Sequence, residues 1–127
     1  MADLSDVHVL VVEDTDDTRE LLREALEFCG ALVTTAASKK EAERLLDRLR
    51  PHVIVSDITM PDDGVELLRH VMEVANTRGP EIPVIAVSAH HTERRALERA
   101  GFVEFIAKPL DPLRLCDRVR AHVRPAA

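Results

Sequence analysis

Short, mostly apolar runs alternate with helix-like segments along this chain, and this alternation limits the possible folds more than any other feature of the sequence. Four runs rich in Val and Ile occupy residues 7–12, 52–56, 82–87 and 102–107, and a fifth that contains two Thr residues occupies residues 31–36. Such runs are typical of strands that are buried on both faces of a parallel sheet. The chain is therefore expected to form an α/β sheet with helices on both faces.

Segments with helical periodicity separate these runs. Helices are expected over residues 15–29, 39–50, 64–76 and 92–100, with a last helix that begins at Pro112. Their inward positions are predicted to be Leu21, Leu22, Ala25, Leu26, Phe28 and Cys29, then Ala42, Leu45, Leu46 and Leu49, then Val65, Leu68, Val71, Met72 and Ala75, and finally Leu113, Leu115, Cys116, Val119 and Val123. Right-handed crossovers then favour a single-domain, doubly wound, five-stranded parallel sheet of order 2-1-3-4-5, flavodoxin-like, with five helices.

Several local signals mark where these helices begin and end. Ser38 and Glu41 have the spacing of a capping box, and Pro51 is expected to end the second helix. Gly30 suits a left-handed cap after the first helix. Asp111 is expected to cap the last helix, ahead of a proline at its first position.

Two cysteines allow one disulfide at most. Cys29 is expected at the end of the first helix and Cys116 near the start of the last one. If both helices run antiparallel to the strands, these positions lie at opposite edges of the sheet, ~20 Å apart. That separation is too large for a disulfide, so two reduced, core-packed thiols are predicted.

Charge and hydropathy exclude several classes of protein. A net charge of −6, with basic residues interleaved among acidic ones, disfavours direct nucleic-acid binding and binding to acidic membranes. No apolar stretch reaches the ~20 residues of a membrane span, and the N-terminus does not resemble a signal peptide. A cytoplasmic protein is expected, with residues 1–127 forming one domain, a core over about residues 6–124 and no output domain.

Polar residues follow the predicted strands at the edge where parallel strands place their ligands. The first strand ends at Glu13 and Asp14, and the third ends at Asp57. The fourth strand ends at Ser88 and the fifth at Lys108. Three clustered carboxylates repel one another unless their pKa values rise or a cation lies among them. Oxygen ligands of this kind suit Mg2+, or Mn2+ in its place.

This set of groups is suited to phosphoryl transfer, which requires mainly positioning and charge neutralisation. Asp57 is the better candidate for the nucleophile because its strand is more central and it stands alone in its loop. Lys108 would supply a fixed positive charge, and Ser88 a hydroxyl donor, to the phosphoryl oxygens.

At this point the sequence clearly resembles the receiver domains of two-component response regulators. The resemblance covers about residues 6–124, and the full set of motifs in this order is highly specific. The matching positions are Val12-Glu13-Asp14, Asp57 followed by Met60-Pro61 and Asp63-Gly64, Ser88-Ala89 and Lys108-Pro109.

The resemblance implies a role for each of these residues. Asp57 would be the phospho-acceptor and, with Asp14 and the backbone carbonyl of Thr59, a ligand of Mg2+. Glu13 would act mainly through a metal-bound water. Ser88 and Lys108 would contact the acylphosphate, and the Lys108–Pro109 bond would be cis. Phe105 occupies the switch-aromatic position, so its rotation would alter the face formed by the fourth helix, the fifth strand and the fifth helix.

The chain departs from the family pattern in one loop. Residues 60–64, Met-Pro-Asp-Asp-Gly, form a loop one residue shorter than the usual Met-Pro-x-x-Asp-Gly. This shortening affects the geometry expected around Thr59 and the start of the third helix, but not the acceptor itself. Thr59 and His90 occupy the positions that tune dephosphorylation, and their combination does not predict a phosphoryl lifetime.

The implied function is a phosphoryl-accepting switch, supplied by a sensor histidine kinase or a histidine phosphotransfer protein and acting on an unknown downstream protein. Such a domain catalyses only its own phosphorylation and dephosphorylation. The alternatives are a phosphorylation-independent interaction module and a flavodoxin-like cofactor carrier, with an aspartyl-phosphate hydrolase more distant. The carrier is disfavoured because the chain contains no Trp or Tyr to stack a flavin and no phosphate-cradling loop after the first strand.

Overall fold

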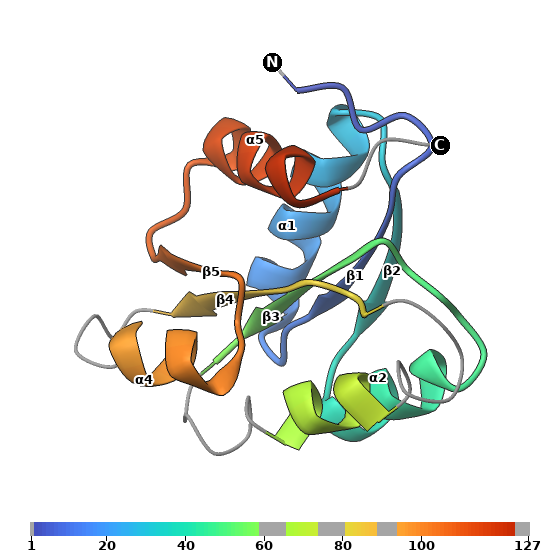
Figure 1. Ribbon diagram of the computed structural model, residues 1–127. Helices are drawn as coiled ribbons and strands as arrows, with labels where there is room; N and C mark the ends of the chain where they lie inside the picture. Colours follow the sequence, from blue (N-terminus) through green and yellow to red (C-terminus); the bar gives the residue numbers. More distant parts are fainter. Residues whose placement is uncertain (1, 59–65, 74–80, 89–93, 124–127) are drawn as a thin grey trace.

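A five-stranded parallel sheet forms the centre of the computed structural model, which describes residues 2–58, 66–73, 81–88 and 94–123. The strand order is β2-β1-β3-β4-β5, as the sequence predicted (Figure 1). The strands are β1 (His8–Val12), β2 (Leu32–Ala36), β3 (Val53–Asp57), β4 (Val84–Ser88) and β5 (Glu104–Ala107).

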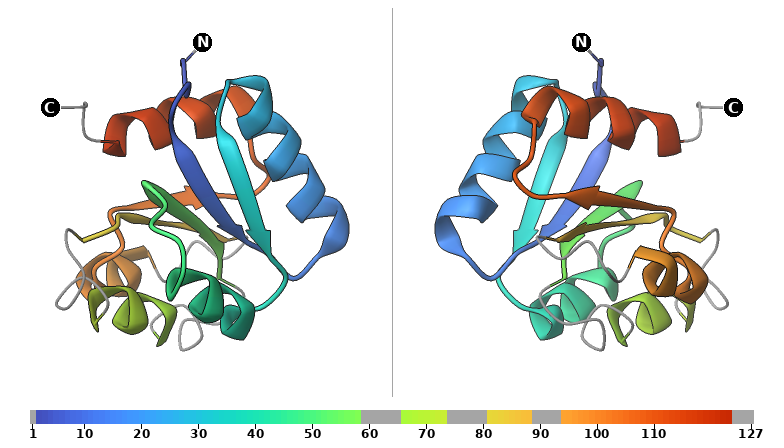
Figure 2. Two further views of the ribbon diagram at one scale, coloured as in Figure 1. Left: turned by 90° about the vertical axis from the view of Figure 1, so that its right-hand side faces the viewer. Right: turned by 90° about the vertical axis from the view of Figure 1, so that its left-hand side faces the viewer.

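Helices cover both faces of this sheet, which makes the fold doubly wound (Figures 1 and 2). α1 and α5 lie on one face, whereas α2, the helix over residues 66–73 and α4 lie on the other. Their bounds are α1 (Asp16–Phe28), α2 (Lys39–Leu46), α4 (Arg94–Ala100) and α5 (Pro112–His122).

The alternation of side chains along each strand explains why the central strands are mostly apolar. Val9 and Val11 belong to the core on the α1 and α5 side, whereas Leu10 and Val12 belong to the core on the opposite side. Successive residues of a strand point to opposite faces, so both faces of a strand that is covered by helices on both sides favour apolar side chains. β2 is less buried because it is one of the two edge strands, and its Leu32 is exposed.

The capping signals at Gly30 and Ser38 are confirmed. Gly30 has a positive φ of 101°, and its N–H donates to the Glu27 carbonyl while the Ala31 N–H donates to the Leu26 carbonyl. These two bonds form a Schellman motif, which explains the need for glycine at this position. The Ser38 hydroxyl accepts from the Glu41 N–H at 3.1 Å.

The cap of α5 is also as expected. The Asp111 carboxylate accepts from the Leu113 N–H at 3.0 Å, and Pro112 follows at the first helical position. Glu41, however, reaches back to the Ala37 N–H at 3.0 Å. The capping box of α2 therefore extends one residue further back than the standard motif.

Element boundaries and inward faces differ from expectation in several places. All five strands begin one or two residues later than predicted, and α2 ends at Leu46 rather than just before Pro51. Among the predicted inward positions, Leu21, Phe28, Met72 and Leu113 are exposed, whereas Leu67, which was not predicted, is buried. Each residue turns a helix by about 100°, so a small rotation moves the buried stripe onto neighbouring positions. The predicted Val65 and Ala75 lie outside the described residues.

The two cysteines are closer together than predicted. Both are buried and free, and both belong to the same core cluster. The Cys116 thiol donates to the Ala25 carbonyl of α1 at 3.4 Å, and the Cys29 N–H donates to that same carbonyl at 3.4 Å. The predicted separation is wrong because α5 is not in line with α1 but crosses its C-terminal part (Figure 2). The prediction of two free, core-packed thiols is confirmed.

Candidate functional site

The register of the sheet brings the predicted strand-end residues to one edge. Val12 of β1 is paired with Ser56 of β3, so the residues that come next, Glu13 and Asp57, lie at the same level of the sheet. Asp57 is in turn level with Val87 of β4, and Ser88 is level with Ala107 of β5. Each functional residue therefore ends or follows its strand at nearly the same level of the sheet.

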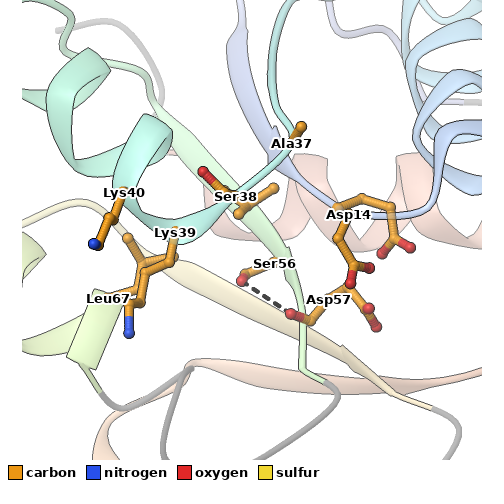
Figure 3. Close-up of a pocket in the computed structure, with 10 residues that line it drawn as sticks. Asp14, Ala37, Ser38, Lys39, Lys40, Ser56, Asp57 and Leu67 are labelled. Atoms are coloured by element: carbon orange, nitrogen blue, oxygen red, sulfur yellow. Dashed lines mark hydrogen bonds between the residues drawn. The ribbon is translucent and has the colours of Figure 1, made fainter.

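Three carboxylates converge at this edge. Glu13, Asp14 and Asp57 each offer one oxygen, and these three oxygens lie within 4.8 Å of one another. Glu13 is buried and Asp14 is exposed, whereas the side chain of Asp57 is 6% exposed. In Figure 3 the carboxylates of Asp14 and Asp57 lie side by side at the edge of a pocket. The pocket has a volume of about 320 Å³ and extends to the start of α2 at Ser38.

Lys108 supplies the positive charge at this cluster. Its Nζ lies 3.0 Å from Asp57 Oδ1 and 3.7 Å from Glu13 Oε2. Its backbone N–H donates to the Ser88 carbonyl at 2.9 Å, which anchors the chain at the end of β5. The bond between Lys108 and Pro109 is cis, as the family resemblance implied. One ammonium group therefore faces two buried carboxylates.

The protonation of Glu13 reflects this excess of negative charge. Burial, the negative charge of Asp57 and hydrogen bonding with Asp57 raise the pKa of Glu13 to about 7, against the opposing effects of Lys108 and the Thr15 N–H. Glu13 Oε2 is buried and has no hydrogen-bond partner among the described residues. An orphaned carboxylate oxygen next to two further carboxylates is the donor set that a hard divalent cation prefers. The residues present therefore fit Mg2+.

Ser88 and Phe105 are both buried, at the end of β4 and within β5. Phe105 belongs to the core on the α2 and α4 side of the sheet, together with Ala86 of β4. It also lines a hollow of about 470 Å³ with residues of α4 and α5. Phe105 thus connects the sheet interior with the surface between these helices. Thr59 and His90 lie outside the described residues.

Two residues that hold the loop containing Glu13 and Asp14, called the acidic loop below, were not predicted from the sequence. The Thr15 N–H donates to Glu13 Oε1 at 3.3 Å, and Arg19 Nη1 donates to the Glu13 carbonyl oxygen at 3.0 Å. The only sequence signal was an arginine in the second turn of a helix that begins with acidic residues. Position 19 lies three and seven residues before the buried Leu22 and Leu26, so helical periodicity places Arg19 beside the inward face of α1, but it gives no reason to connect Arg19 with Glu13.

Comparison with known proteins identifies the family. The sequence matches the response regulator receiver domain over residues 9–120, and the chain therefore belongs to this family. Within the described ranges, no helix combines the length and the apolar character that a membrane span requires.

Individual relatives agree with this assignment. An uncharacterised 14.6 kDa protein of Leptolyngbya boryana is 44% identical over 125 residues, with 96% of this chain and 94% of that protein covered. Response regulator MprA of Mycolicibacterium vanbaalenii is 35% identical, with 93% of this chain but 51% of MprA covered. The chain thus spans about half the length of that regulator.

A solved structure provides a comparison for the site. The receiver domain of a sensor histidine kinase of Pseudomonas aeruginosa PAO1 is 27% identical with a TM-score of 0.78, and the match covers 91% of this chain and 96% of that domain. That structure has a magnesium ion coordinated in its active-site cleft. The chain is therefore a signalling receiver domain of the two-component type whose acidic cluster could hold a metal.

Proposed function

We propose that this chain is a phosphoryl-accepting switch in which Asp57 is the acceptor. The observation that carries the proposal is the contact of 3.0 Å between Asp57 Oδ1 and Lys108 Nζ, beside a cluster of three carboxylates. A carboxylate that is held against a fixed ammonium, and that has further acidic groups for a cation, combines a nucleophile with charge neutralisation. The donor would be a sensor histidine kinase or a histidine phosphotransfer protein.

Mg2+ would be held by Asp14, Asp57 and the carbonyl of Thr59, with Glu13 acting through a bound water. The ion would neutralise negative charge on the carboxylates and on the incoming phosphoryl group. Mn2+ has similar ligand preferences and is expected to substitute for it.

The chain's own residues account for the transfer. An Asp57 carboxylate oxygen attacks phosphorus, a P–O bond forms, and the P–N bond to the donor histidine breaks. Lys108 then balances charge on the phosphoryl oxygens, and the Ser88 hydroxyl donates to one of them. The same groups would serve dephosphorylation, in which a water oxygen attacks phosphorus, the P–O bond to Asp57 breaks, and inorganic phosphate leaves. The domain would therefore catalyse only its own phosphorylation and dephosphorylation.

The output would be a change of the α4–β5–α5 face. Movement of Ser88 toward the phosphoryl group would free space for Phe105, which lines the hollow between α4, β5 and α5. Glu104 beside it pairs with Arg118 of α5 at 2.5 Å and with His122 at 2.8 Å. A downstream protein, rather than nucleic acid or membrane, would read this face, in the cytoplasm. Residues 1–127 would act as one receiver domain.

Phosphorylation by a small donor tests the proposal. The protein is incubated with acetyl phosphate and Mg2+, and its intact mass is measured for the wild type, for Asp57→Asn and for Asp17→Asn, an exposed carboxylate in the first turn of α1. We expect a Mg2+-dependent adduct of phosphoryl mass in the wild type and in Asp17→Asn, and none in Asp57→Asn. An adduct that persists in Asp57→Asn, or its absence from the wild type, would contradict the assignment. The interaction-module alternative predicts no adduct in any of them.

A further inference from the structure

Arg19 holds the backbone of the acidic loop from the side of α1. Its Nη1 donates to the Glu13 carbonyl oxygen at 3.0 Å, and its Nη2 lies 2.5 Å from Asp16 Oδ1. The side chain is 21% exposed, although Arg is a residue that usually extends into solvent. Its two donor nitrogens therefore connect the end of β1 with the first turn of α1.

The contact with a carbonyl oxygen affects the next residue. The Glu13 carbonyl belongs to the planar peptide group that joins Glu13 to Asp14. The Glu13 N–H is already held by the Ala36 carbonyl at 3.0 Å. Fixing the carbonyl oxygen as well sets the orientation of the whole peptide plane, and hence the direction in which the Asp14 side chain leaves the backbone.

The orientation of Asp14 depends on this fixed peptide plane because the Asp14 side chain itself is only weakly hydrogen-bonded. Asp14 is exposed, and its contact with the Thr15 hydroxyl is long, at 3.5 Å. Glu13, in contrast, is buried and accepts from the Thr15 N–H. Of the two carboxylates in the loop, Asp14 is the one whose position is set by the main chain.

We propose that Arg19 is a positioning residue for the cation site and that it acts through Asp14. This inference rests on the proposed function, in which the three carboxylates bind Mg2+. Geometry and charge predict opposite effects for removal of Arg19. Loss of a positive charge near an acidic site would by itself tighten Mg2+ binding. Loss of the hydrogen bond to the Glu13 carbonyl would leave Asp14 less well oriented and would weaken Mg2+ binding.

Calorimetric Mg2+ titration of the full chain distinguishes these effects. For Arg19→Gln we expect binding weaker by on the order of 10-fold, the size typical of residues that orient metal ligands. Arg23→Gln is the matched control, because Arg23 lies one turn along α1 and, within the described part of the chain, forms its ion pairs with Glu20 and Glu27. The control should change affinity less than about 2-fold, since exposed charges are largely screened.

A double-mutant cycle tests whether the effect passes through Asp14. In an Asp14→Asn background, Arg19→Gln should cause no further loss of Mg2+ affinity if Arg19 acts only by orienting Asp14. Arg19→Lys keeps the charge but not the two-pronged contact, and should bind roughly 3-fold more weakly than the wild type. If Arg19→Gln does not fold, the Mg2+ affinity of Arg19→Lys decides whether Arg19 positions the cation site.

The outcomes separate this inference from the proposed function. A wild type that does not bind Mg2+ would refute the proposed cation site itself. A wild type that binds Mg2+, with Arg19→Gln and Arg19→Lys binding it as tightly or more tightly, would refute the role of Arg19 and leave the acceptor proposal intact. A further loss on Arg19→Gln in the Asp14→Asn background would show that Arg19 does not act through Asp14.

Discussion

The substitution Glu13→Gln should stabilise the metal-free protein at alkaline pH. The pKa of Glu13 is raised from 4.5 to about 7, chiefly by burial and then by the charge of Asp57. Each pKa unit corresponds to about 1.4 kcal/mol, so ionised Glu13 costs the folded state on the order of 3 kcal/mol. Glutamine has nearly the same shape and carries no charge, so it should remove most of this cost.

The sign of the pH dependence follows from proton binding. Between pH 4.5 and about 7 the unfolded chain loses the Glu13 proton while the folded chain retains it. The free energy of unfolding of the wild type should therefore fall over this range through Glu13, and change no further above it. His8, whose pKa burial lowers, acts in the opposite sense near neutral pH. The difference between the variant and the wild type isolates the contribution of Glu13.

Urea unfolding followed by circular dichroism measures this difference, since the chain has no Trp or Tyr for fluorescence. With EDTA present, Glu13→Gln should equal the wild type at pH 4 and exceed it by up to about 3 kcal/mol at pH 8. Mg2+ at 100 times its dissociation constant should stabilise the wild type by about 2.7 kcal/mol and the variant by less. Glu24→Gln, at an exposed position of α1, serves as the control and should change stability by less than about 0.5 kcal/mol.

Two results would refute this reasoning. One is a metal-free Glu13→Gln variant that is less stable than the wild type at pH 8. The other is a difference between the two proteins that does not change with pH. Either result would mean that the buried carboxylate is not electrostatically strained in the absence of a cation.

Two further predictions concern the packing of α1. Leu26→Ala, at a fully buried position, should destabilise the fold by about 2–5 kcal/mol, whereas Phe28→Ala, at a side chain that is 74% exposed, should change stability by less than about 0.5 kcal/mol, both measured by urea unfolding. Equal effects would contradict the observed inward face of α1. Burial and the neighbouring Cys29 thiol raise the pKa of Cys116 to about 12. In a Cys29→Ser variant, which leaves Cys116 as the single thiol, Cys116 should therefore react with iodoacetamide at pH 8 far more slowly in the native state than in urea. Mass spectrometry follows the reaction. Rapid alkylation of the native variant would show that this thiol is accessible.

Much of the site could be predicted from local sequence because the strands and the groups at their ends are local features. Glu13, Asp57 and Lys108 each follow a recognisable apolar run, and parallel strands place their carboxyl ends at one edge. The contact of 3.0 Å between Lys108 and Asp57 agrees with that expectation. Their catalytic roles remain predictions.

The inward faces of the helices were less predictable because helical periodicity leaves the rotation of each helix open. Leu21 and Leu22 are neighbours of equal hydrophobicity, yet only Leu22 is buried. A rotation of about 100° separates two such positions, and packing against the sheet selects one of them. The same reasoning accounts for Leu67, whose burial the pattern did not indicate.

Three features could be predicted from the sequence: the order of the strands and helices, the residues that cap the helices, and the polar groups that meet at the carboxyl edge of the sheet. All of these follow from residue spacing and from the fixed handedness of βαβ connections. Two contacts arise only from the packing of the folded chain: α5 crosses α1, which brings Cys116 next to Cys29, and Arg19 reaches the Glu13 carbonyl. Such contacts join residues through the packing of whole elements. They depend on crossing angles and side-chain directions, which no local pattern encodes.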